Sequence, residues 1–110
     1  MASGKIEAKK DWQYFTQTTG NAAVNISNLT FKELLIQVDG NHSGNKEVFY
    51  IPKFILSSSN NWFRMGGYGN AATQSALVTI RASLSEVALV NCYMNNQDYL
   101  TGTVTQIFYR

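Results

Sequence analysis

The sequence contains only one cysteine and one histidine among its 110 residues. Cys92 cannot form an internal disulfide, and its position in an apolar segment predicts a buried thiol. Metal sites need several His, Cys or carboxylate ligands that converge on one point. His42 has no such partners at suitable spacing, and we interpret it as an exposed loop residue. We therefore expect no metal and no cofactor.

Charge and long apolar runs are also scarce, and this excludes two classes of partner. Charged residues make up 15% of the chain, against about 25% in ordinary globular domains. The net charge is only +2, with no clustered basic face, so no nucleic-acid partner is expected. No stretch approaches the roughly 20 apolar residues of a membrane span. No apolar run follows the N-terminal residues, so neither a signal peptide nor a membrane partner is predicted.

Patterns of catalytic residues are missing as well. A glycoside hydrolase needs two carboxylates at a set separation, whereas the acidic residues here lie at predicted strand ends or near the N-terminus. A triad built from Asp39, His42 and Ser43 fails, because neighbours within one turn cannot adopt the spatial arrangement of a triad. We predict that the protein is not an enzyme and has no catalytic residues.

Neutral polar residues are abundant instead. Asn, Gln, Ser and Thr account for 35 residues, and hydrophobic residues make up 45% of the chain. A chain of this length suits one domain with its own core. Uncharged amides and hydroxyls favour hydrogen bonding to sugars, or packing between subunits, over electrostatic capture. We interpret the lysine-rich residues 1–10 as a flexible lead-in or linker and residues 11–110 as the domain.

Short apolar stretches alternate with turns rich in Asn, Gly, Ser and Thr, which is typical of antiparallel β-structure. The first two predicted strands should pair around the turn at 18–21, and the strand at 86–94, apolar on both faces, should be central. Pro52 should lie at an edge, bulge or break, and Gly66-Gly67 should mark a bend or bulge. The fold class predicted is all-β, a single antiparallel β-sandwich that is jelly-roll-like. Eight strands are predicted, at residues 12–17, 22–27, 34–39, 47–56, 62–68, 75–83, 86–94 and 102–110.

The predicted core follows from the alternation of apolar and polar residues along these strands. Helical content should be far below that of ordinary globular proteins. The last strand should close a sheet with its apolar residues. The core residues predicted are Ile36, Val38, Phe49, Ile51, Val78, Ile80, Leu89, Val90 and Phe108.

The alternating direction of the strands predicts where a ligand would bind. Loops 40–46, 69–74 and 95–101 should share the end of the sandwich opposite the N-terminus, and loops on a rigid scaffold are the usual carriers of binding. A flank is expected at Trp62, Arg64 and Tyr68, since sugar sites combine an aromatic platform with amide and guanidinium donors. For the aromatic residues Trp62 and Tyr68, core or subunit contacts are the alternative, which the usual burial of aromatic side chains favours. The loop residues predicted to bind ligand are Asn41, Asn70, Asn95, Asn96, Asp98 and Tyr99.

Three short motifs connect the chain to a family. They are Phe49-Tyr50-Ile51-Pro52-Lys53, Gly66-Gly67-Tyr68, and the ending Thr103-Val104-Thr105-Gln106-Ile107-Phe108-Tyr109-Arg110. Over residues 31–110 the chain resembles the small C-terminal β domain of tail-fibre and minor structural proteins from bacteriophages and prophages of Gram-positive gut bacteria. The resemblance implies a β-sandwich on a longer fibre of the virion tail, made in the host cytoplasm. It also implies recognition of a host surface component, in particular a bacterial glycan, and assembly into a homo-oligomer, with a trimer among the forms it allows.

Two other functions fit the same residues. One is a free-standing carbohydrate-binding or adhesin module at the bacterial cell surface. The other is a purely structural domain that binds only copies of itself. The resemblance transfers no binding residues, because its matching motifs look structural.

Overall fold

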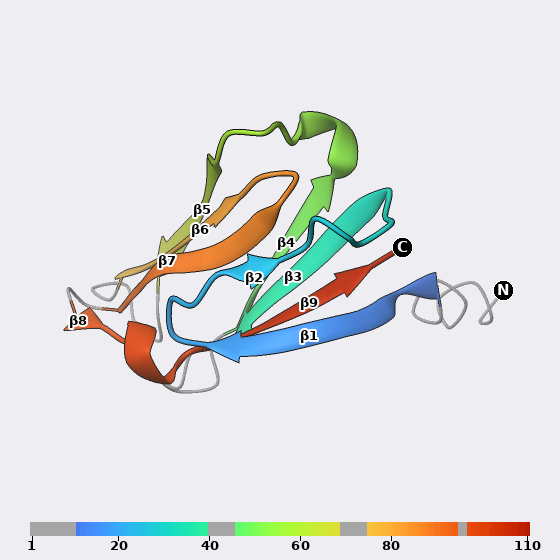
Figure 1. The fold of residues 1–110 in the computed structure, drawn as a ribbon. Helices are drawn as coiled ribbons and strands as arrows, with labels where there is room; N and C mark the ends of the chain where they lie inside the picture. Colours follow the sequence, from blue (N-terminus) through green and yellow to red (C-terminus); the bar gives the residue numbers. More distant parts are fainter. Residues whose placement is uncertain (1–10, 40–45, 69–74, 95–96) are drawn as a thin grey trace, which may run out of the picture.

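The structure, a computed structural model, describes residues 11–39, 46–68, 75–94 and 97–110. These residues form two antiparallel sheets that pack face to face, and they contain no α-helix, as predicted (Figure 1). Two short 3-10 turns, η1 (Lys53–Ile55) and η2 (Leu100–Gly102), lie between strands. The strands are β1 (Gln13–Thr19), β2 (Val24–Asn25), β3 (Glu33–Asp39), β4 (Lys46–Pro52), β5 (Asn61–Tyr68), β6 (Ser75–Ala82), β7 (Glu86–Met94), β8 (Gln97–Asp98) and β9 (Val104–Tyr109).

The early strands lie beside the late ones. The four-stranded sheet has the order β1-β9-β3-β4, and the five-stranded sheet has the order β2-β7-β6-β5 with β8 beside β7. The pairs β1–β9, β3–β9 and β2–β7 join strands that are far apart in the sequence, as in jelly rolls. The hairpins β3–β4, β5–β6 and β6–β7 form the rest of the two sheets. The predicted pairing of residues 12–17 with 22–27 is wrong, because the turn after β1 carries the chain into the other sheet. Gly20 makes this turn with a φ of 74°, and its amide donates to the Thr103 carbonyl at 2.9 Å.

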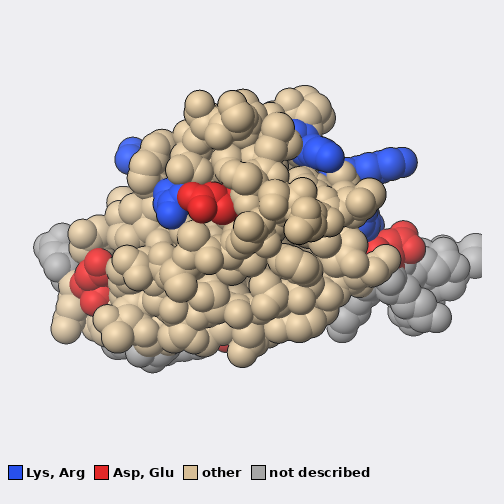
Figure 2. Space-filling model, viewed as in Figure 1, with Lys and Arg blue, Asp and Glu red and all other residues tan. Residues whose placement is uncertain are grey.

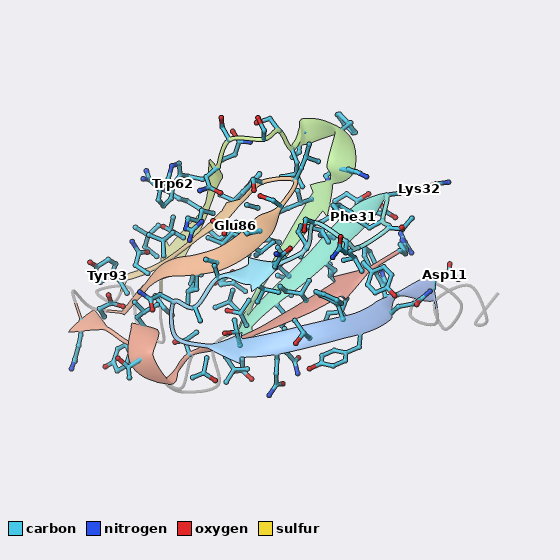
Figure 3. All side chains as sticks on the ribbon, in the orientation of Figure 1. Asp11, Phe31, Lys32, Trp62, Glu86 and Tyr93 are labelled. Carbon is cyan, nitrogen blue, oxygen red and sulfur yellow. The ribbon has the colours of Figure 1, made fainter. Side chains whose placement is uncertain are left out.

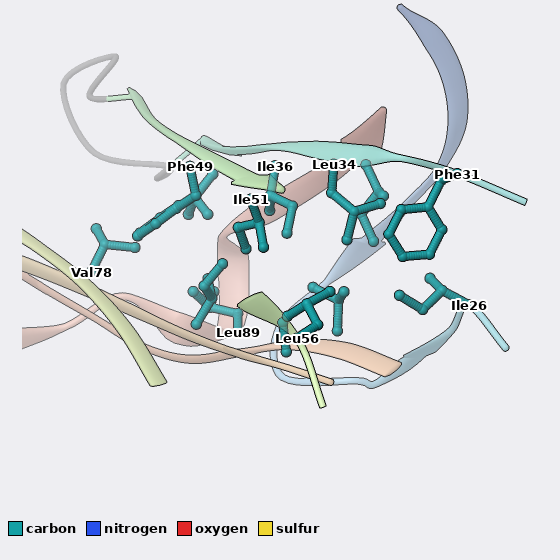
Figure 4. Close-up of a cluster of buried hydrophobic side chains, with 14 of the residues drawn as sticks. Ile26, Phe31, Leu34, Ile36, Phe49, Ile51, Leu56, Val78 and Leu89 are labelled. Carbon is teal, nitrogen blue, oxygen red and sulfur yellow. The ribbon is translucent and has the colours of Figure 1, made fainter. Parts of the chain in front are cut away.

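The core lies between the two sheets and is formed by their inward-facing apolar side chains (Figure 4). Ile26, Phe31 and Leu56, which precede or follow strands in the sequence, are also buried there. Core residues that the sequence predicted correctly are Ile36, Val38, Phe49, Ile51, Val78, Ile80 and Leu89.

The prediction that Val90 lies in the core is wrong, because β7 contains a bulge. The register between β6 and β7 shifts by one residue here, so that Val90 has no partner on β6. Leu89 and Cys92 on either side are both buried in the core. Val90 and Asn91 therefore both lie on the outer face of the sheet.

The prediction that Phe108 lies in the core is also wrong. In β9 the buried side chains are those of Thr105 and Ile107, which face the opposite sheet. Phe108 faces outward, where its ring lies 5.6 Å from that of Tyr14 in the neighbouring strand. Because residues 107–109 are all apolar, the sequence does not show which of them face the interior. The structure buries Ile107, which is smaller than Phe108.

Two further predictions concern strand interruptions. Pro52 ends β4 at the edge of the four-stranded sheet, which confirms its predicted position at an edge or break. Gly66 and Gly67 do not form a bulge, since β5 pairs with β6 without a shift through both residues. The predicted central strand, β7, lies between β2 and β6 and is confirmed.

The thiol of Cys92 is buried, as the sequence predicted. Burial, which disfavours the thiolate, raises the pKa of this group above its ordinary value. The thiol therefore stays protonated and unreactive at neutral pH.

Candidate ligand-binding face

The loop residues predicted to bind ligand fall into two groups. Asn41, Asn70, Asn95 and Asn96 lie outside the described residues, as does His42. The strand ends that flank their loops are described, and they lie at the end of the sandwich away from the start of β1 and the C-terminus (Figure 1).

Asp98 and Tyr99 lie within the described residues, and both make hydrogen bonds that stabilise the local fold. The Asp98 carboxylate accepts hydrogen bonds from the backbone amides of Cys92 at 3.3 Å and Leu100 at 3.0 Å. The carbonyl of Tyr99 accepts a hydrogen bond of 2.6 Å from the hydroxyl of Thr103. These contacts hold the connection from β8 to η2, so both residues have a structural role whatever else they contact.

Trp62 and Arg64, predicted as a flank, lie on the outer face of the five-stranded sheet. The register places the side chains of this face in three rows across β5, β6 and β7. Trp62 stands in the first row at 55% exposure, and Leu77 and Tyr93 stand in the third at 37% and 38%. Trp62 and Tyr93 lie on the same side of the molecule (Figure 3). Tyr68 ends β5, and its side chain lies outside what the structure describes.

The middle row consists of Arg64, Thr79 and Asn91, directly opposite one another on the three strands. We call it the polar row. Thr79 is only 1% exposed. Within the described part of the chain, the Thr79 Oγ1 and Asn91 Oδ1 atoms are buried without a hydrogen-bond partner. A buried polar atom without a partner costs about 1–3 kcal/mol, so the described residues leave this cost uncompensated in the polar row.

Arg64 contributes a cation to the polar row. Its side chain is exposed, and none of the described ion pairs includes it. The neighbouring Arg81 is neutralised by an ion pair with Glu86. In Figure 2 an adjacent blue and red pair lies where Figure 3 labels Glu86, within a surface of uncharged residues. Among the described residues of this face, Arg64 is therefore the cation without an ion-pair partner.

The outer face of the four-stranded sheet carries a second set of aromatic side chains that the sequence analysis missed. The register aligns Tyr14, Phe108, Leu35 and Tyr50 in one row across all four strands. Tyr14 and Tyr50 are both 53% exposed. No pattern within one strand predicts this row, because each strand contributes a single member and only the pairing of distant strands aligns them.

The polar groups beside this row bond to one another. The Nε2 of Gln37 donates to the Oε1 of Gln106 at 3.2 Å, and the Nε2 of Gln106 donates to the Oε1 of Gln17 at 3.3 Å. Three side chains from three strands thus form one chain of amide hydrogen bonds. Among the described residues, this face has no buried polar side-chain atom that lacks a hydrogen-bond partner, unlike the polar row.

A cluster at the edge of the same face is also internally paired. Glu33 accepts hydrogen bonds from Tyr50 and Arg110, and Trp12 lies over the Arg110 guanidinium at 4.3 Å. The hydrogen bond from Tyr50, followed by that from Arg110, lowers the pKa of the half-buried Glu33 carboxyl. The same bond to Glu33 raises the pKa of Tyr50. The charged groups of this cluster, Glu33 and Arg110, therefore pair with each other.

No three His, Cys, Asp or Glu side chains among the described residues come together in a way that could hold a metal ion. None of the described elements is a helix long and apolar enough to cross a membrane.

No family model, no curated protein and no solved structure matches this chain. The geometry of the two outer faces is therefore the basis for inferring the function.

Proposed function

We propose that the protein is a non-catalytic binding domain that recognises a glycan through the outer face of the five-stranded sheet. The observation that carries this proposal is the polar row, whose buried Thr79 and Asn91 oxygens lack partners while Trp62 and Tyr93 stand exposed on either side. Sugars have apolar ring faces that stack on aromatic side chains, and hydroxyls that both donate and accept hydrogen bonds. Specific sites combine apolar surface with a few such polar groups.

Each group of the polar row suits a ligand hydroxyl. The Asn91 Oδ1 can only accept, so it requires a donor, whereas the Arg64 guanidinium requires an acceptor. The Thr79 hydroxyl does both. The face extends about 13 Å along β5 from Trp62 to Gly66 and about 10 Å across the strands, using ordinary strand spacings. These dimensions suit an oligosaccharide better than a single sugar.

The family resemblance supplies the biological setting of the proposal. A glycan-binding sandwich at the end of a phage tail fibre would attach the virion to the wall of a Gram-positive host. A free-standing adhesin or carbohydrate-binding module at the bacterial surface would use the same face. In both settings the protein binds without catalysis.

A purely structural role is the second candidate, and one observation favours it. The aromatic row on the four-stranded sheet has polar neighbours that are already bonded to one another, as in surfaces that become buried between subunits. This role predicts self-association without any binding to glycans.

A double substitution tests the glycan proposal. The variant Trp62→Ala with Arg64→Ala should lose binding to Gram-positive cells and to purified wall glycan by about tenfold or more, because it removes the stacking platform and the cation. Both side chains are exposed, so the melting temperature should hardly change. Binding is measured by sedimentation with cells and by titration with solubilised glycan.

The matched control is Tyr14→Ala with Gln17→Ala on the four-stranded sheet, which removes an exposed aromatic and a polar residue from the other face. This variant should bind as the wild type does. The proposal fails if the control loses binding and the Trp62, Arg64 variant does not. It also fails if the wild-type protein binds no wall glycan at all.

The single substitution Thr79→Val separates binding from stability. It replaces a buried hydroxyl that lacks a partner with a methyl group of similar shape. Thermal stability should stay equal or rise by about 1 kcal/mol, whereas glycan affinity should fall roughly fivefold with the loss of one hydrogen bond. Both are measured on the same preparation by thermal unfolding and binding titration.

Thr105→Val is the control for that experiment. The Thr105 hydroxyl is equally buried and lacks a described partner, but it faces the interior of the sandwich. Its replacement should affect stability in the same direction and leave glycan binding unchanged. Equal losses of binding in both variants would contradict a role for Thr79 in ligand contact.

A further inference from the structure

Within the described residues, the two sheets end in five edge strands, and four of these are protected against pairing with another chain. In β1 the register shifts between Tyr14 and Thr16, which interrupts the edge at Phe15. β2 and β8 have only two residues each. β4 ends at Pro52, which cannot donate a backbone hydrogen bond.

The remaining edge strand, β5, has none of these protections. It pairs with β6 without interruption from Asn61 to Tyr68, and it contains no proline and a single charged residue, Arg64. None of the described backbone hydrogen bonds outside the ladders involves β5. Its second edge therefore presents a row of amides and carbonyls along eight residues.

We propose that this edge pairs with β5 of a second copy of the same chain, in antiparallel orientation about a twofold axis. The pairing joins two five-stranded sheets into one continuous sheet. Directly opposite residues must lie on the same face of a sheet. In a symmetric antiparallel pair, one residue of β5 must therefore lie on the axis, opposite its own copy.

The sequence of β5 selects one of these registers. With Arg64 on the axis, two guanidinium groups would face each other, and like charges directly opposite are destabilising. With Met65 on the axis, Arg64 lies opposite Gly66 of the partner, and Phe63 lies opposite Gly67. An aromatic side chain across from glycine is a favourable pair in sheets, since it covers the exposed backbone. This register pairs residues 62–68 of both chains.

The fit of large residues to small ones, and of the cation to a glycine, argues for a second copy as the occupant. Pairing would also place the two polar rows on one shared surface, so that two sites could engage a repetitive ligand together. The association itself does not depend on the glycan proposal, because it uses backbone groups and β5 residues at the sheet edge.

The variant Met65→Cys tests the register. Directly opposite residues of an antiparallel pair have Cα atoms about 4.5–5.5 Å apart, within the range of about 4.4–6.8 Å that a disulfide spans. With oxidised glutathione, which is reduced as the bond forms, this variant should give a covalent dimer roughly tenfold faster than the matched Arg64→Cys variant. The buried Cys92 leaves the wild type without cross-linking.

The mass in solution tests the association itself. The wild-type chain of 12.3 kDa should sediment as a dimer. Met65→Lys sets two ammonium groups on the axis and should raise the dissociation constant about tenfold or more, with an unchanged circular dichroism spectrum. A monomeric or trimeric wild type, a dimer that survives Met65→Lys unweakened, or equal cross-linking at positions 64 and 65 would each overturn the proposal.

Discussion

Removal of residues 104–110 is expected to leave the protein unfolded or insoluble. The segment forms β9, which lies between β1 and β3 and pairs with both. Its loss leaves β1 without a partner strand and exposes the inner edge of β3 for aggregation. It also removes Ile107, which is completely buried in the core. Circular dichroism and the soluble fraction after expression measure the outcome.

A chain that ends at Tyr109 is the control for this deletion. It loses the side-chain contacts of Arg110 with Glu33 and Trp12 and the backbone hydrogen bonds of Arg110 with Lys32 and Glu33, but it keeps the whole strand. This shorter deletion should stay soluble and folded. A soluble protein with an unchanged melting temperature after deletion of residues 104–110 would show that β9 is peripheral.

The substitution Leu89→Ala is expected to lower the free energy of unfolding by about 2–5 kcal/mol. Leu89 is 1% exposed and lies in the central strand of the five-stranded sheet. Its truncation removes buried apolar surface and leaves a cavity that the close-packed neighbours cannot fill. Chemical denaturation gives the change directly, and an unchanged slope of the transition shows that the native state is otherwise intact.

The same strand supplies a matched pair that tests the bulge. Val87 is 1% exposed, whereas Val90 is half-buried on the outer face. Val87→Ala should cost about 1–3 kcal/mol, and Val90→Ala should cost less than about 1 kcal/mol. Equal costs would mean that Val90 belongs to the core and that the bulge is misplaced.

Much of the fold follows from local features of the sequence. The alternation of Ile36 and Val38 with polar residues determined both the strand and its inward face. The apolar character of residues 87–90 on both faces indicated a central strand, and Pro52 indicated the end of an edge strand. These predictions were correct because their physical causes are local. The alternation of buried side chains along a strand, and the missing amide of proline, depend on only a few neighbouring residues.

The partners of the strands and the composition of the two outer faces were decided only by the tertiary structure. β1 pairs with β9 at the other end of the chain, and no local pattern encodes a contact over that separation. The bulge in β7 reverses the alternation after Leu89, which brings Asn91 to the outer face beside Thr79. The sequence alone determined that the protein is a β-sandwich with Trp62 and Arg64 as candidates for binding. Only the register across three strands placed the polar row between the exposed aromatic residues. The extra residue of a bulge moves every following side chain of its strand to the opposite face, and the sequence does not show where such a bulge lies.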